Sequence, residues 1–148
     1  MPREHAQITM TREELLAFLG QDRRLVLGTI AADGGPWGDA VAYALHDERV
    51  FFRVPLRTRS LANIRRDSRV CCVVESHPLG SSYYQIKGAI VHGKAEEARS
   101  GTLPGKVRSA LDAAPDPVEP ARKDGVVFSV GLEDVASFDF GKIKHRYE

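Results

Sequence analysis

Arginines are concentrated in one short stretch of this sequence, where they face a single acid, Asp67. The stretch holds Arg53, Arg57, Arg59, Arg65, Arg66 and Arg69, although the whole chain has a net charge of only +1. The run Arg57-Thr58-Arg59-Ser60 falls where a strand is expected to give way to a helix. The first turn of a helix offers free backbone N–H groups and the positive end of its dipole, so this run has the composition of a phosphate site. A solvent-exposed helix face with a capping threonine explains the same residues equally well.

The surrounding residues predict the elements that position this run. Apolar alternation predicts antiparallel strands over 24–30, 37–45 and 50–54, with turns at 31–36 and 46–48. Pro55 ends the third strand, and 58–66 is typical of a short helix that buries Leu61 and Ile64. A fourth strand is expected over 69–75. A fifth is expected over 83–94, with bulges or bends at Gly88 and Gly93.

The two ends of the chain are expected to complete a small barrel. A helix is predicted over 10–20, because Thr11 and Glu14 have the spacing of a capping box and Gly20 suits a left-handed stop. Another helix, interrupted early by Gly101, Pro104 and Gly105, is expected over 95–111. A surface loop is expected over 113–124, and strands over 126–130 and 135–140. Six or seven short strands with helices at their connections predict a mainly β, antiparallel split barrel of the Greek-key type, forming one domain over residues 1–148.

This order of elements resembles the flavin-binding split barrels, a family that includes pyridoxamine 5′-phosphate oxidase and relatives that use a deazaflavin coenzyme. The resemblance covers residues 11–95. It rests on the turn Asp33-Gly34-Gly35-Pro36, the strand after it, the aromatic strand with Arg53, the arginine-rich helix start and the run from Asp67 to Val70. The resemblance implies a homodimer that holds its cofactor in a groove at the subunit interface.

The resemblance also implies which residues bind the cofactor. Thr58 and Arg59 match typical phosphate ligands, and Arg57 would compensate for a serine, Ser60, where many relatives have lysine. Asp39 replaces a residue that is basic in the pyridoxamine phosphate enzyme, which argues against pyridoxamine phosphate as the substrate. The flavin ring is expected along the strand 39–42, largely through backbone contacts, and against the next strand at 52–53. The implied set is Asp39, Ala40, Val41, Ala42, Phe52, Arg53, Arg57, Thr58, Arg59, Ser60 and Asn63, the last matching an asparagine common in the deazaflavin-using branch.

The function implied by the resemblance is an FMN-dependent oxidoreductase that transfers a hydride to or from a small organic substrate. A deazaflavin (F-420)-dependent reductase and a non-catalytic flavin- or haem-binding protein are the alternatives. The sequence shows no acid–base constellation, which counts against a hydrolase but not against a flavoprotein, whose cofactor carries the chemistry. No catalytic residue or substrate can be named. Trp37, Tyr83 and Lys87 either approach the cofactor or pack in the ordinary way.

The composition argues against several other classes of protein. Hydrophobic residues make up 43% and charged residues 28%, which is typical of a soluble globular chain. No apolar run is long enough for a membrane span and the N-terminus is polar, so a cytoplasmic protein is expected. Cys71 and Cys72 are adjacent and the histidines are scattered, so no metal is expected. The near-neutral charge and the small share of aromatic residues, 7%, argue against nucleic-acid binding.

Overall fold

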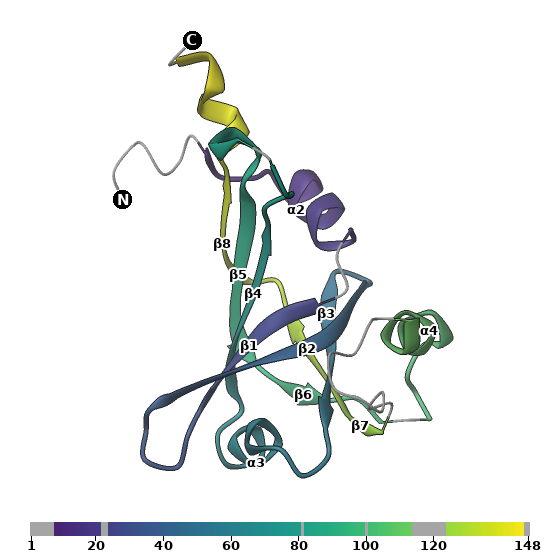
Figure 1. Ribbon diagram of the computed structural model, residues 1–148. Helices are drawn as coiled ribbons and strands as arrows, with labels where there is room; N and C mark the ends of the chain where they lie inside the picture. Colours follow the sequence, from purple (N-terminus) through teal and green to yellow (C-terminus); the bar gives the residue numbers. More distant parts are fainter. Residues whose placement is uncertain (1–7, 22–23, 81, 100, 114–123, 147–148) are drawn as a thin grey trace.

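The structure, a computed structural model, describes residues 8–21, 24–80, 82–99, 101–113 and 124–146. One curled antiparallel sheet has the strand order β6-β7-β3-β2-β1-β4-β5-β8 (Figure 1). The predicted mainly β split barrel with flanking helices is confirmed, with eight strands because a two-residue edge strand adds to the seven expected. The strands are β1 (Arg24–Ile30), β2 (Pro36–His46), β3 (Arg49–Pro55), β4 (Arg69–Ser76), β5 (Lys87–Lys94), β6 (Glu96–Glu97), β7 (Gly125–Gly131) and β8 (Asp134–Asp139).

Alternate strand residues point into the curled sheet and form the core. In β1, Leu25 and Leu27 are buried, whereas Val26 between them lies on the outer face and is 51% exposed. Tyr43 of β2 and Phe52 of β3 lie opposite each other and are fully buried in the same core. This period of two gives each strand an inner face, toward the core, and an outer face.

Gly88 and Gly93 do not form the predicted bulges. β5 pairs with β4 residue by residue along its whole length, so the ladder is uninterrupted. A Cβ on Gly93 would lie 2.6 Å from Cγ2 of Val130 in β7, and a Cβ on Gly88 would overlap the ring of Phe138 in β8. Glycine is therefore needed for close packing, and Gly93 lets β5 approach β7 across the interior.

The N-terminal helix, α2 (Arg12–Leu19), begins at the predicted cap. The Thr11 hydroxyl accepts a hydrogen bond from the Glu14 N–H at 3.2 Å, and the Glu14 carboxylate accepts one from the Thr11 N–H at 2.9 Å. Gly20 ends the helix with φ −76°, so the predicted left-handed stop is wrong. The predicted apolar face is buried: Leu15, Phe18 and Leu19.

Two segments differ from the sequence-based expectation. Tyr83–Gln85 forms a 3₁₀ turn, η1, instead of the start of β5, because the Tyr83 ring stacks on Phe140 of η2 (Phe140–Arg146) with centroids 4.5 Å apart. The region 95–111 begins with the short strand β6, which was not predicted, and its helix, α4 (Gly105–Ala113), starts directly after Pro104, one of the predicted interruptions. Most of the predicted loop 113–124 lies outside the described residues.

The two remaining helices lie against the sheet near the arginine-rich junction. α3 (Arg59–Arg66) follows β3 and buries Leu61 and Ile64, as predicted. α4 lies beside β2 and β3, where Val107 and Leu111 pack with Ala44 (Figure 1). Because α3 meets the inward side of β2 and α4 its outward side, the two helices border the predicted flavin strand from opposite faces.

Candidate functional site

The arginine-rich run lies at the junction where β3 ends and α3 begins. Arg57 has φ +63°, a left-handed conformation that is uncommon for a residue with a side chain. The next residue, Thr58, is the N-cap of α3. Its hydroxyl accepts a hydrogen bond from the Leu61 N–H at 3.3 Å and donates one to the Pro55 carbonyl at 2.8 Å. Thr58 therefore fixes the path of the chain from strand to helix.

Arg57 and Arg59 have no acidic partner within the part of the chain that the structure describes. The Arg59 guanidinium lies over the ring of Trp37, 4.7 Å from its centroid. Arg57 is exposed and lines a cavity of about 270 Å³ together with Pro55, Leu56 and Asp124. Both cations are thus available to an anion next to the first turn of α3.

The other arginines of the cluster are already engaged. Arg66 donates hydrogen bonds to the Ile30 carbonyl at 3.0 Å and to the Asn63 side-chain oxygen at 2.8 Å. Three form ion pairs: Arg53 with Asp112 (2.7 Å), Arg65 with Glu97 (3.5 Å) and Arg69 with Asp67 (2.7 Å). Within the described chain, the two arginines of the cluster whose guanidinium groups make neither a hydrogen bond nor an ion pair are therefore Arg57 and Arg59, at the start of α3.

The far end of α3 is capped by Asp67. Hydrogen bonds from Arg69 lower the pKa of the Asp67 carboxyl to about 2, so it is ionised at neutral pH. The Asp67 N–H also caps the helix by donating to the Asn63 carbonyl at 2.8 Å. An acidic residue thus caps the end of α3, whereas the first turn of the helix contains no acidic residue.

Ser60 and Asn63 face the barrel and not the open start of the helix. Ser60 is fully buried, and its hydroxyl lies 3.4 Å from a carboxylate oxygen of Asp39. The Asn63 amide donates to the buried Thr29 hydroxyl at 3.0 Å. Both side chains lie on the helix face that also buries Leu61, because residues three apart share a face. They hold α3 against β1 and β2.

The strand segment 39–42 presents two different faces. Val41 is buried in the core and Asp39 turns toward Ser60, whereas Ala40 and Ala42 lie on the outer face. Methyl side chains on that face leave the strand backbone accessible to a flat ring. α4 packs against Ala42, and Ala40 is exposed.

Phe52 and Arg53 point to opposite faces of β3. Phe52 is fully buried and stacks on Phe128 with ring centroids 6.0 Å apart, so its side chain is part of the barrel core. The Arg53 side chain is on the outer face, where it is 11% exposed. It donates hydrogen bonds to the Asp112 carboxylate at 2.7 Å and to the Leu111 carbonyl at 3.0 Å. Arg53 is therefore tied to α4.

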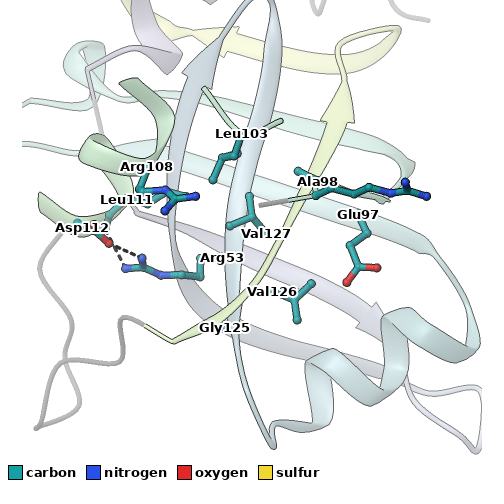
Figure 2. A pocket seen from close by; sticks show the side chains of 11 residues that line it. Arg53, Glu97, Ala98, Leu103, Arg108, Leu111, Asp112, Gly125, Val126 and Val127 are labelled. Atoms are coloured by element: carbon teal, nitrogen blue, oxygen red, sulfur yellow. Dashed lines mark hydrogen bonds and ion pairs between the residues drawn. The ribbon is translucent and has the colours of Figure 1, made fainter. Parts of the chain in front are cut away.

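Arg53 also belongs to a cavity that the sequence does not predict. The cavity has a volume of about 630 Å³ and lies between α4, β3, β7 and residues 97–99 and 103 (Figure 2). Its charged residues come from distant segments, so no motif could have revealed them. They are Arg53, Glu97, Arg99, Arg108 and Asp112.

Other kinds of site find no support in the described part of the chain. No three side chains of His, Cys, Asp or Glu are close enough there to hold a metal ion. None of its helices has the length and apolar character that a membrane span requires. Burial raises the pKa of the Cys72 thiol to about 12, so Cys72 packs as a small uncharged residue at neutral pH.

Comparison with protein families gives a match over most of the chain. A family model described as pyridoxamine 5′-phosphate oxidase matches residues 11–138. A search of curated proteins gave no match.

Several solved structures share the fold at low sequence identity. A conserved hypothetical protein from Mycobacterium tuberculosis is 24% identical, with a TM-score of 0.75 over 93% of this chain and 90% of that one. A protein described as FAD-binding, from Mesorhizobium loti, is 23% identical, with a TM-score of 0.68 over 87% and 93%. A protein described as an F420 reductase is 21% identical, with a TM-score of 0.55 over 80% and 93%. With the family model spanning most of its length, this chain belongs to the pyridoxamine 5′-phosphate oxidase family of flavin-binding split barrels.

Proposed function

We propose that this protein is an FMN-dependent oxidoreductase that transfers a hydride to or from a small organic substrate. The observation that carries the proposal is the pair Arg57 and Arg59, two guanidinium groups without an acidic partner in the described chain, at the first turn of α3. A phosphate monoester is bound well by such a combination of cations and free backbone N–H groups. Bound FMN supplies the hydride chemistry, and the protein supplies binding and orientation.

The residues around this pair would hold it in place for the phosphate. Thr58 fixes the turn through its two hydrogen bonds, and Ser60 and Asn63 anchor the helix to the strands behind it. The left-handed backbone of Arg57 also supports a ligand site, because uncommon backbone conformations cluster where ligands bind. In this proposal Arg57 and Arg59 contact the phosphate, whereas Ser60 and Asn63 act by positioning α3.

The outer face of β2 would receive the flavin ring. Ala40 is exposed, and because its side chain is only a methyl group the strand backbone there is accessible. The neighbouring strand, β1, contributes Gly28 and the exposed side chain of Val26. A second copy of the chain would cover this apolar face and exclude water from the ring. We therefore also propose a homodimer with the cofactor at its interface, which sedimentation or light scattering of the purified chain tests directly.

Two related functions have specific support. The fold shared with the F420 reductase favours a deazaflavin coenzyme, whose phosphate the same two arginines would bind. The fold shared with the FAD-binding protein favours flavin binding, and flavin binding without catalysis is the second alternative. All three functions place an anionic cofactor at the start of α3. They differ in which cofactor is bound and in whether the protein catalyses a reaction with it.

The visible spectrum of the purified protein, followed by mass analysis of what heating releases, tests the proposal. We expect a yellow protein that releases FMN and that oxidises a reduced nicotinamide with an artificial acceptor. Binding of the deazaflavin alone would favour the first alternative, and bound flavin without turnover would favour the second. A colourless protein that binds none of these cofactors would refute the proposed function.

A further inference from the structure

We propose that the cavity beside α4 is a binding site for an organic anion with a compact apolar body, separate from the flavin phosphate site. Its volume of about 630 Å³ lies within the range of small-molecule sites. α4 forms one wall, β3 and β7 form the floor, and residues 97–99 and 103 form the opposite wall (Figure 2). The cavity is therefore built by several elements and is not the surface of a single loop.

Positive charge predominates in the lining. Three arginines, Arg53, Arg99 and Arg108, face two acids. Both acids already have arginine partners: Asp112 pairs with Arg53 at 2.7 Å, and Glu97 pairs at 3.5 Å with Arg65, which lies outside the cavity. A cationic ligand would therefore find both carboxylates engaged, whereas an anion would meet Arg99, whose guanidinium belongs to neither ion pair.

Arg53 provides the fixed cation of this site. Its side chain is 11% exposed, yet it lines the cavity. Within the described residues its guanidinium makes two hydrogen bonds, to Asp112 and to the Leu111 carbonyl. A guanidinium carries five N–H donors, and donors left without a partner in a buried position are costly. An anion in the cavity would accept hydrogen bonds from the remaining donors.

The other lining residues are mostly apolar, and they favour a ligand whose uncharged part is also apolar. Figure 2 shows the side chain of Arg53 beside α4, Arg108 on that helix, and Val127 on β7. Leu103 and Val127 are part of the small apolar cluster under α4. A carboxylate or sulfonate would therefore lie at the arginines, and a short alkyl chain or ring would contact the apolar residues of the lining: Ala98, Leu103, Leu111, Val126 and Val127.

The cavity is distinct from the flavin phosphate site. Of the residues predicted to bind the flavin, the described lining contains Arg53 and neither Arg57, Thr58 nor Arg59. Arg53 is held by α4, whereas the phosphate site lies at the start of α3. The inference therefore does not depend on the proposed function, and flavin-free protein is suitable for testing it.

Fluorescence titration of flavin-free protein with 8-anilinonaphthalene-1-sulfonate tests the inference. We expect saturable binding of this amphipathic anion, displaced by octanoate at a concentration at least tenfold lower than by 1-octanol. Arg99→Gln should weaken probe binding about tenfold, the scale of one charge-assisted hydrogen bond. Lys106→Gln is the matched control, because Lys106 is an exposed cation of α4 outside the cavity lining. This variant should bind the probe as tightly as the wild type.

A second variant examines Arg53 without leaving its partner unpaired. The double variant Arg53→Gln/Asp112→Asn removes both charges of the ion pair, and a far-ultraviolet circular dichroism spectrum like that of the wild type shows that it folds. It should bind the probe at least tenfold more weakly. Equal displacement by octanol, or equal weakening in Lys106→Gln, would overturn the inference. Displacement of the probe by FMN would also overturn it, because the cavity would then be part of the flavin site.

Discussion

Replacing Arg59 with alanine tests the proposed phosphate site most directly. Arg59 is exposed, lies over Trp37 at 4.7 Å and has no acidic partner in the described chain, so the variant removes one available cation and little else. Loss of a charge-assisted hydrogen bond costs about 1.5–3 kcal/mol. At about 1.4 kcal/mol for each factor of ten, the Kd for FMN should rise about 10- to 150-fold. The free energy of unfolding should change little, because an exposed cation–π contact contributes only about 0.5–1 kcal/mol.

Quenching of FMN fluorescence on titration with the protein measures this change. Arg65→Ala is the matched control, because it removes the same charge from the same helix, about 9 Å further along its axis, where Arg65 pairs with Glu97. Its affinity for FMN should stay within about twofold, on the scale of a screened surface charge. Riboflavin lacks the phosphate, so wild type and Arg59→Ala should bind it equally. Unchanged affinity of Arg59→Ala for FMN, or an equal loss for riboflavin, would refute the assigned site.

Three further predictions concern the framework around the site. Gly93→Ala should lower the free energy of unfolding in urea by about 1–3 kcal/mol, because the added methyl lies 2.6 Å from a valine across the barrel. Asn63→Ala should cost about 1–3 kcal/mol in the same assay, because the buried Thr29 hydroxyl loses its hydrogen-bond donor. Glu14 has its pKa lowered to about 2, mainly by a hydrogen bond from Lys142, so its stabilising effect is fully present above about pH 4.5 and is lost as the pH falls toward 2. Glu14→Gln should therefore be less stable than the wild type at pH 7 and equally stable below pH 2 in thermal unfolding.

Neighbouring positions supply the controls for these predictions. A Cβ on Gly38 would lie 4.0 Å from Val26, an ordinary contact, so an equal loss in Gly38→Ala would contradict the packing argument for Gly93. Ala62→Ser changes an exposed position of α3 beside Asn63, and an equal loss there would point to the helix and not to the hydrogen bond. Glu13→Gln alters an exposed carboxylate in the same helical turn as Glu14, and the same pH dependence there would argue against the contact with Lys142.

Local sequence signals predicted much of the fold. The capping box of Thr11 and Glu14 located the start of α2, and the alternation of residues 24–30 matched β1 at both ends. These signals depend on residues close together in the chain, where one hydrogen bond or one period determines the local conformation. The positive charge at the start of α3 was also visible in the sequence, because the arginines and Thr58 are nearly consecutive.

Contacts between distant residues explain what the sequence could not reveal. Tyr83 has a side chain typical of a strand, but its stacking on Phe140 favours a 3₁₀ turn. Gly93 suggested a bulge, yet its small size serves a contact with β7. Ser60 matched a ligand position in the family, whereas the helical period turns its side chain toward Asp39. In each case the partner is remote in sequence, and no local pattern indicates it.

The edge strand β6 has a consequence for how the molecule behaves at high concentration. An open sheet edge is a template on which another chain can add a strand, the first step toward fibrils. Here that edge offers only two residues, Glu96 and Glu97, both exposed and each close to an arginine, Arg49 and Arg65 respectively. A second copy of the chain would find only this two-residue edge, which carries two carboxylates. The edge strand β6 therefore offers little for another strand to add to, and the sheet edge can stay uncovered without promoting aggregation.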